Sequence, residues 1–381
     1  MGLLRVLLAL AVLFEHTGGI GGYVMIGGPL AVQCFFIISG FYMGLVLNER
    51  YDRPALNRAF YVNRALRIYG IYFFFLAIHL GLFALLQAKG MDTPLAIYGE
   101  DRISVIERIG LGLLNFTVFG QELPMWLRVS EGHLVWSSQF LGSGGDEVFH
   151  YMMIPMAWSL SLELTFYAIA PFIARRPAWQ IAVVAGLSFA ARIIAAAFGW
   201  VHDPLSFRFF PFELALFLAG VLAYKAWAAN KLRWETGWAK VLALAVPAAI
   251  LAWPLYLGNW SEDLFFTPPR LALLALVAVG LPAIHGWSRY NRRDRTFGEL
   301  SFPIYLDHLL VFSLIGVIPV LKTSDTLWTL ATVLVSMALA WLVVRMLDSR
   351  IEQFRRGLAS RAGATEDAAA SSAPPRDLSA I

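Results

Sequence analysis

Arg5 and His16 are the first residues of the chain whose types and spacing could do chemistry. They bound an apolar stretch, RVLLALAVLFEH, at residues 5–16. In an α-helix this separation makes three turns plus about 20°, so the two side chains share one stripe and lie about 16 Å apart along the axis. A guanidinium binds anionic groups, and an imidazole acts as a general base or as a nucleophile that receives an acyl group. The pair predicts a site for a long, thin ligand with one anionic and one reactive end.

The composition indicates a protein that crosses a membrane several times. Of its 381 residues 59% are hydrophobic and 15% are charged, whereas soluble domains carry about 25% charged residues. The net charge of +4 comes from short basic clusters between apolar segments, which is typical of membrane topology and not of nucleic-acid binding. The single cysteine, Cys34, excludes an internal disulfide and a cysteine-rich metal site. No HExxH, GK[ST] or GxSxG motif occurs, and we expect no metal.

Ten apolar segments have about the 20 residues that one crossing requires. They lie at 3–22, 29–47, 67–88, 155–173, 179–199, 209–227, 239–257, 270–286, 299–320 and 327–346. Glu15 and His16 interrupt the first segment and no small-residue cleavage site follows it, so we expect it to be retained and not cleaved as a signal peptide. The sequence predicts an all-α, polytopic membrane helix bundle in one domain, 1–350. The segment 351–381, rich in Ala, Ser and Pro, is predicted to be a disordered cytoplasmic tail.

The segment 103–120 is an eleventh candidate. The distribution of basic residues decides whether it crosses the membrane, because cytoplasmic connections collect Lys and Arg. If it does not cross, most basic residues between the segments become cytoplasmic: Arg50, Arg53, Arg58, Arg64, Arg67, Arg175, Arg176, Lys225, Lys231, Arg233, Lys240, Arg289, Arg292, Arg293 and Arg295. If it does cross, every cluster from Arg175 onward falls on the wrong side. We therefore predict about ten crossings, both termini in the cytoplasm, and a re-entrant or interfacial helix near 103–120 within an outer connection.

Few polar groups lie within the predicted spans, and such groups are costly in hydrocarbon unless they face the interior of the bundle. They are Glu15, His16, Gln33, Ser39, Ser159, Ser161, Glu163, Arg192, Asp307 and His308. Their overlapping depths predict a polar chamber, while hydrogen bonding between helices is the alternative role of each. A carboxylate near His16 would fix its orientation. Glu15 points about 100° away on the same helix, so Glu163 and Asp307 are the freer candidates.

Arg64 and Arg67 lie where the third span enters the membrane, three residues apart and therefore on one face of a helix. Basic residues at such a position commonly anchor a helix on the cytoplasmic side. Arginine also binds phosphate groups through parallel hydrogen bonds. The pair is thus either an anchor of the third span or a phosphate clamp.

Five stretches in chain order resemble the motifs of the acyltransferase-3 family of integral membrane acyltransferases. They are Arg5 with His16, FFIISGF at 35–41, NRALRIY at 63–69, WSLSLELTFY at 158–167 and GELSFPIYLDHLLV at 298–311. The match runs over residues 3–346. The chain departs from the family in one place, since many members carry a second acidic residue where Leu164 follows Glu163.

The resemblance implies transfer of an acyl group, usually acetyl, from cytoplasmic acyl-CoA to a hydroxyl of a cell-surface polysaccharide or lipid-linked sugar, in the inner (plasma) membrane of a bacterium. It implies that Arg5, Arg64 and Arg67 hold the phosphates of coenzyme A. His16, as general base or acyl acceptor, and Glu163 are the catalytic candidates. Supporting or substrate-binding candidates are Glu15, Ser39, Trp158, Ser159, Arg192, Arg208, Asp307 and His308. Because no esterase-like domain is appended, we expect this domain to complete the transfer itself or to hand over to a polysaccharide-biosynthesis partner.

A proton-coupled transporter of a sugar or an anionic metabolite is the alternative function, with the intramembrane His and Glu residues forming a proton relay. Such a protein is expected to contain two related halves with interrupted helices in corresponding places. No such repeat is visible in the sequence. A structural subunit fits poorly with so many ionisable groups in the spans. The acyltransferase is therefore the leading hypothesis.

Overall fold

The computed structural model describes residues 1–141, 147–257 and 267–346, and these residues are mainly helical. Ten described helices have 16 residues or more: α1 (Gly2–Thr17), α2 (Gly28–Glu49), α3 (Asn57–Ala88), α6 (Ala157–Ile173), α7 (Ala178–Ala197), α9 (Phe210–Ala229), α10 (Gly237–Leu257), α11 (Pro268–Ser288), α12 (Arg292–Ile315) and a last helix, Asp325–Met346. Eight of them are long and apolar enough to cross a membrane, while α1 and α6 are shorter. The predicted all-α polytopic membrane bundle is confirmed. The predicted tail, 351–381, lies outside the described residues.

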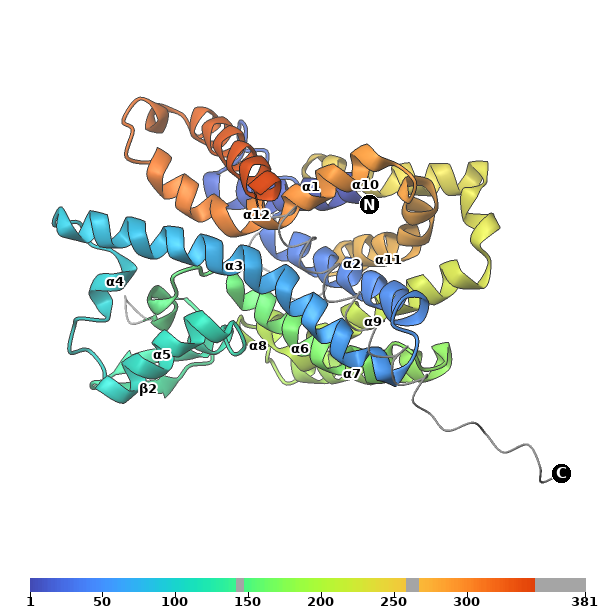
Figure 1. Ribbon diagram of the computed structural model, residues 1–381, viewed down its shortest axis with the longest axis horizontal. Coiled ribbons are helices and arrows are strands. Elements are labelled where there is room, and N and C mark those ends of the chain that lie inside the picture. The colour runs from blue at the N-terminus through green and yellow to red at the C-terminus, as the bar shows by residue number, and fades with distance from the viewer. Residues whose placement is uncertain (142–146, 258–266, 347–381) are drawn as a thin grey trace, which may run out of the picture.

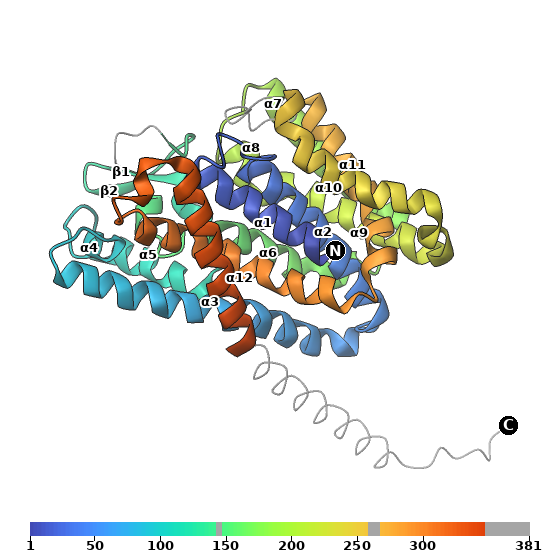
Figure 2. The same ribbon diagram turned by 90° about the horizontal axis from the view of Figure 1, so that it is seen from above.

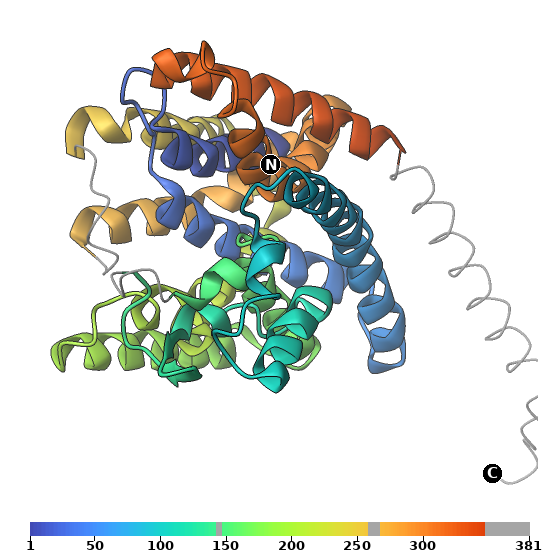
Figure 3. The same ribbon diagram turned by 90° about the vertical axis from the view of Figure 1, so that its left-hand side faces the viewer.

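The two N-terminal helices form the centre of the bundle, and the other long helices surround them (Figure 3). α1 packs along α12 and α2, α2 packs along α9, and α10 pairs with α11. One end of the bundle, where α1 begins and α2 leads to α3, is named here the basic end. The arginines that line its cavity are Arg5, Arg50, Arg64, Arg67, Arg289 and Arg295.

The opposite end of the bundle carries the long excursion between α3 and α6, at the left of Figure 1, and is named here the hairpin end. The excursion contains α4 (Pro94–Ile97), α5 (Val105–Thr117) and an antiparallel pair, β1 (Leu127–Ser130) and β2 (His133–Trp136). The ring of Trp126 stacks on that of Trp136 with centroids 5.4 Å apart, and Trp136 is 65% exposed. An aromatic surface therefore faces outward at this end.

Two glycines allow the close contact of α2 and α9, which lie side by side in Figure 2. A Cβ on Gly40 would lie 1.8 Å from the carbonyl oxygen of Phe217, and one on Gly220 would lie 1.9 Å from that of Ile37. Small residues at such positions let the backbones of membrane helices approach each other. The glycines thus bring the polar residues of α2 and α9 within reach of one another.

Two helices begin earlier than the apolar segments predict. α3 begins at Asn57, ten residues before the predicted span 67–88, and α12 begins at Arg292, seven residues before 299–320. A hydropathy pattern detects only the part of a helix that lies in hydrocarbon, whereas the backbone stays helical where charged side chains are in water. Arg64 and Arg67 therefore lie on one continuous helix and not in a loop.

The segment near 103–120 forms α5, whose 13 residues are too few for a crossing. Ser104 starts it with a capping box, in which its Oγ accepts from the backbone N–H of Glu107 and the Glu107 carboxylate accepts from the Ser104 backbone. One exposed stripe is apolar and consists of Val105, Ile106, Ile109, Leu113 and Phe116. An apolar stripe on a polar helix is typical of a helix lying in the membrane interface, which favours the interfacial alternative.

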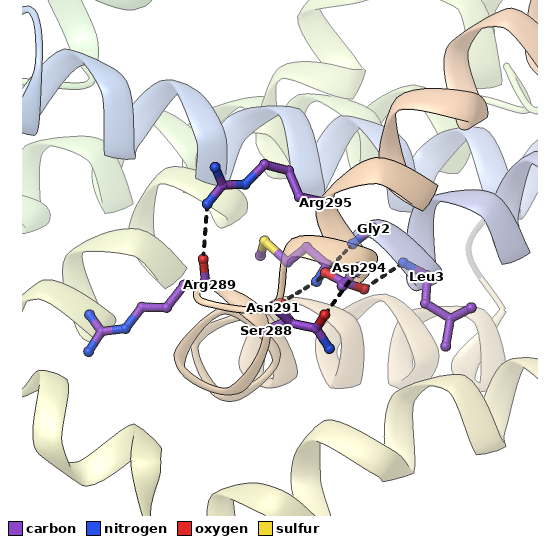
Figure 4. A network of polar contacts seen from close by, with 8 residues as sticks. Gly2, Leu3, Ser288, Arg289, Asn291, Asp294 and Arg295 are labelled. Carbon is purple, nitrogen blue, oxygen red and sulfur yellow. Dashed lines mark hydrogen bonds and ion pairs between the residues drawn. The ribbon is translucent and has the colours of Figure 1, made fainter. Parts of the chain in front are cut away.

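Asp294, in the first turn of α12, holds the start of α1 (Figure 4). Its carboxylate accepts hydrogen bonds from the backbone N–H groups of Gly2 and Leu3, both at 2.8 Å, and from the amino group of Met1 at 2.7 Å. The first N–H groups of a helix have no partner within it, and a carboxylate there also interacts favourably with the helix dipole. Asp294 thereby fixes the depth at which Arg5, in the next turn, enters the cavity.

We expect the Asp294→Ala substitution to lower the free energy of unfolding by about 1–2 kcal/mol, because loss of an acceptor at a helix start costs about that much. The melting temperature of the purified protein in detergent measures the effect. Asp52→Ala is the matched control, since Asp52 is an exposed acid at the same end, 3.6 Å from the side chain of Arg53. Equal melting temperatures for the two variants would contradict the anchoring role.

Candidate active site

A cavity of about 560 Å³ opens at the basic end and extends between α1, α2, α3, α6, α11 and α12. This volume is within the range of small-molecule sites, about 300–1,000 Å³. Predicted site residues that line it are Arg5, Ser39, Arg64, Arg67, Ser159 and Glu163. Four helices that are distant in sequence, α1, α2, α3 and α6, therefore bring six of the candidates to one space.

Arg5 and Arg67 are two cations that line the same cavity. Arg5 is partly buried on α1, and Arg67 of α3 and Glu163 of α6 lie within electrostatic range of it. In the part of the chain that the structure describes, neither guanidinium forms an ion pair or a side-chain hydrogen bond. Two unpaired guanidiniums in one cavity attract an anion with several acceptor oxygens, such as a phosphate group.

Glu163 lies in the middle of the cavity wall and is held by two neighbours. One carboxylate oxygen accepts hydrogen bonds from Ser39 Oγ, at 2.6 Å, and from the hydroxyl of Tyr167. Ser39 Oγ and the Tyr167 hydroxyl are themselves 3.2 Å apart. The second oxygen of Glu163 stays available for a donor group on a ligand.

Tyr305 and Ser159 form the deep end of the cavity. Ser159 Oγ lies 2.8 Å from the Tyr305 hydroxyl, and the Tyr305 ring packs against those of Phe35 and His308, each with centroids 6.2 Å apart. His308 does not line the cavity, so Tyr305 is the residue that connects the cavity to the histidine behind it.

His16 lies in the last turn of α1, which Gly18 ends with a φ of 79°. Its Nδ1 is 2.8 Å from the carbonyl oxygen of Val12. Because a carbonyl only accepts, Nδ1 carries the proton and Nε2 of the neutral ring keeps its lone pair. His16 thus presents a basic nitrogen in a fixed orientation, although it lies outside the cavity lining.

His308 faces His16, with ring centroids 5.1 Å apart. Its Nδ1 lies 2.9 Å from the carbonyl oxygen of Tyr305 and 3.2 Å from that of Ile304, so this ring too keeps Nε2 unprotonated when neutral. His308 is fully buried, and its Nε2 has no hydrogen-bond partner among the described residues. The two histidines of α1 and α12 form one pair.

The structure directs each candidate carboxylate to a different neighbour. Glu163 accepts from Ser39 and Tyr167, and Asp307 is fully buried beside Ser336 of the last helix. Glu15 lies within electrostatic range of His16, and its carboxylate packs at the glycine that precedes α2. In this structure the Nδ1 of His16 is oriented by its own helix backbone and not by a carboxylate. Among the described residues no cluster of three His, Cys, Asp or Glu side chains is arranged to hold a metal.

Arg192 belongs to a separate buried network that joins α7, α9 and α2. Its Nη1 lies 2.6 Å from Glu213 Oε1, its Nη2 donates to the carbonyl of Ser206, and Gln33 Nε2 donates to Glu213 at 3.3 Å. Arg192 is 1% exposed and Glu213 is 0% exposed. Arg192 therefore forms an ion pair inside the bundle and links helices to one another, which is the alternative role considered for the polar groups in the spans.

Breaking this pair is expected to destabilise the protein strongly. Glu213→Leu leaves the Arg192 charge buried and uncompensated, which costs about 3–5 kcal/mol, whereas Arg192→Leu with Glu213→Leu removes both charges and restores part of the loss. The yield and melting temperature of monodisperse protein in detergent measure both variants. A single variant as stable as the parent protein would contradict the assignment.

Arg208 and Trp158 lie together at the hairpin end of the site. Arg208 closes the short helix α8 (Leu205–Arg208), and its guanidinium carbon lies 4.2 Å from the ring centroid of Trp158 and 4.3 Å from that of Phe140. Two of its nitrogens bind the carboxylate of Asp203 at 2.9–3.1 Å. Trp158 is the neighbour of Ser159, so this cluster adjoins the deep end of the cavity.

Sequence reasoning missed four residues of these networks: Tyr167, Asp203, Glu213 and Tyr305. Glu213 had a usable signal, since it is an acid within an apolar span. Tyr167 and Tyr305 lie four and three residues from Glu163 and His308, at helical spacing. Asp203 lies in a connection and had no signal of its own.

Comparisons with known proteins agree with the sequence motifs. A family model described as an acyltransferase domain matches residues 1–345. Nodulation protein 10 of Rhizobium leguminosarum bv. viciae is 26% identical over 81% of this chain and 81% of its own length. The exopolysaccharide production protein ExoZ of Rhizobium meliloti is 25% identical over 79% of this chain and 82% of its own. An uncharacterized protein of Aquifex aeolicus is 23% identical over 54% of this chain and 90% of its own.

No solved structure matches the chain significantly. The family model spans both ends of the cavity, from Arg5 on α1 to Tyr305 on α12. A model that matches most of a chain establishes the family to which the chain belongs. The chain therefore belongs to the acyltransferase-3 family, and the protein is a membrane acyltransferase.

Proposed function

We propose that the protein transfers an acetyl group from acyl-CoA to a hydroxyl of a cell-surface polysaccharide or a lipid-linked sugar. The observation that carries the proposal is the cavity that joins unpaired guanidiniums at the basic end to Ser159 and Tyr305 beside the histidine pair. The printed names of two relatives, a nodulation protein and an exopolysaccharide production protein, support a surface glycan as acceptor.

In this proposal the donor enters from the cytoplasm. Basic connections collect on the cytoplasmic side, which favours a bacterial plasma membrane with the basic end and both termini in the cytoplasm. Arg5, Arg64 and Arg67 bind the phosphates of coenzyme A. Glu163 then accepts hydrogen bonds from the amide N–H groups of the pantetheine arm, and the thioester reaches Ser159 and Tyr305.

His16 acts as the general base, and it lies beyond Ser159 and Tyr305 as seen from the cavity. The acceptor hydroxyl oxygen attacks the thioester carbonyl carbon while its proton passes to Nε2 of His16. The tetrahedral intermediate then collapses, the carbon–sulfur bond breaks, and the thiolate of coenzyme A takes the proton from His16. The orientation of Nε2 by the Nδ1 contact to Val12 supports this role.

The acceptor approaches from the hairpin end. Exposed aromatic rings bind the apolar faces of sugars, and Trp136, which is 65% exposed and stacks on the buried ring of Trp126, offers such a surface. The acyl group passes either directly to the glycan or to a polysaccharide-biosynthesis partner. Both routes use the same donor site.

The test compares a strain that lacks the gene with the same strain complemented by it. Mass spectrometry of surface glycans is expected to show the mass of an acetyl ester only in the complemented strain. Purified protein in proteoliposomes, given acetyl-CoA, is expected to release free coenzyme A in proportion to acetylated acceptor. Identical glycans in both strains, or proton-coupled solute uptake without consumption of acetyl-CoA, would overturn the proposal.

A further inference from the structure

The side chain of Arg208 is buried and contacts several neighbours. It is 8% exposed, and the ring centroids of Trp158 and Phe140 lie 4.2 and 4.3 Å from its guanidinium carbon. The backbone N–H of Phe140 donates to the carbonyl of Asp203 at 2.9 Å, which ties Phe140 to the partner acid. Only the edges of the guanidinium are left for hydrogen bonds.

One edge is occupied and the other is open. Nε and Nη2 of Arg208 donate to both carboxylate oxygens of Asp203, so the charge of Arg208 is already neutralised. Nη1 is buried and has no hydrogen-bond partner among the described residues. A buried donor without a partner costs about 1–3 kcal/mol. A neutralised guanidinium suits a carbonyl oxygen, on which negative charge develops only in the transition state, better than a permanent anion.

Arg208 lies close to the residues at the proposed point of reaction. Arg208 lies within electrostatic range of both His16 and Tyr305. Its neighbour Trp158 precedes Ser159, whose Oγ is 2.8 Å from the Tyr305 hydroxyl. Arg208 does not itself line the cavity; Trp158 and Ser159 connect it to the part of the cavity wall that the carbonyl of a bound donor reaches in the proposed function.

We propose that Nη1 of Arg208 donates a hydrogen bond to the carbonyl oxygen of the acyl group during transfer, and that Asp203 positions it. This inference rests on the proposed function. As the acceptor oxygen bonds to the carbonyl carbon, the carbonyl π electrons move to the oxygen, where Nη1 stabilises them. They return when the carbon–sulfur bond breaks and the thiolate leaves, and Arg208 gains and loses no proton.

The test uses Arg208→Lys, which keeps the charge and loses the planar fork of donors. In full-length protein in proteoliposomes, kcat for acetyl transfer is expected to fall about 100-fold, with each KM changed less than about threefold. With fluoroacetyl-CoA the loss is expected to be several-fold smaller, because fluorine itself stabilises charge on the carbonyl oxygen. Arg102→Lys, at an exposed pair with Glu100 at the same end, is the control and leaves both rates unchanged.

Three results would overturn the inference. A loss that is equal for acetyl and fluoroacetyl donors indicates a structural role, and a rise in acceptor KM with unchanged kcat indicates that Arg208 binds the acceptor. Unchanged kinetics in Arg208→Lys excludes any role in the reaction. If the parent protein consumes no acetyl-CoA at all, the proposed function fails instead. Asp203→Asn gives a second variant, in which a smaller fall of kcat with the same donor dependence is expected.

Discussion

Replacement of His16 by glutamine is expected to lower kcat for acyl transfer by about 10²- to 10⁴-fold, the range that a general base contributes. Glutamine has a similar reach but no nitrogen that accepts a proton. In the parent protein Nδ1 donates to the carbonyl of Val12, so Nε2 is the nitrogen that takes the proton from the acceptor hydroxyl. Initial rates of acetyl-CoA-dependent transfer in proteoliposomes, at equal amounts of protein, measure the effect.

His79 offers a matched control within the same chain. It is a buried histidine on α3, and its Nδ1 contacts the carbonyl of Phe75 at 2.8 Å, as that of His16 contacts Val12. It does not line the cavity at the basic end. His79→Gln is therefore expected to transfer at the parental rate when its abundance is matched. Undiminished transfer by His16→Gln, or an equal loss in both variants, would remove His16 from the mechanism.

The mass of the parent protein after exposure to the donor distinguishes a general base from an acyl carrier. After incubation with acetyl-CoA and no acceptor, followed by rapid quenching, a base leaves the protein mass unchanged. An acyl carrier adds the mass of one acetyl group, and His16→Gln abolishes that addition. We expect an unchanged mass, because in the proposed mechanism the acceptor hydroxyl attacks the thioester directly and His16 carries only a proton.

The fold was largely predictable because its main determinant is local. An apolar run of about 20 residues identifies a membrane helix without knowledge of its neighbours. The limits of α3 and α12 were not predictable in the same way, since their first turns carry arginines that leave the hydrocarbon but continue the helix. The treatment of α5 as a segment that does not cross depended on charge counting across the whole chain, and its 13 residues agree with it. Charge counting could not predict its stripe of exposed apolar residues.

The candidate site was predictable only where a residue is conspicuous by its own chemistry. Arg5 and Glu163 are charges in apolar runs, and both line the cavity. The orientation of His16 by Val12 could not be predicted, because a backbone carbonyl has no signature in the sequence. Nor could the contact of Arg208 with the rings of Trp158 and Phe140, since these lie on α6 and in the connection before it, far from Arg208 in the sequence.

Removal of the two unpaired guanidiniums is the second large effect that we expect. Hydrogen bonds to charged groups contribute about 1.5–3 kcal/mol each, so Arg5→Gln with Arg67→Gln is expected to lower kcat/KM for acetyl-CoA by about 10²- to 10⁴-fold. Most of the loss is expected in KM for the donor, because the phosphates are bound equally in the ground state and the transition state. The salt dependence of KM is expected to weaken with the loss of the charges.

The decisive comparison uses S-acetylpantetheine, a thioester donor without phosphate groups. If Arg5 and Arg67 bind phosphate, the double variant uses this donor as well as the parent protein does, within about threefold. Arg53→Gln with Arg58→Gln is the matched control, since both arginines are exposed at the same end and neither lines the cavity. An equal loss with both donors would mean that the two arginines shape the bundle and do not bind the nucleotide end. A loss confined to acetyl-CoA would also establish the orientation of the donor. Because Arg5 and His16 share one helix stripe, its phosphates would lie at the basic end and its thioester toward His16.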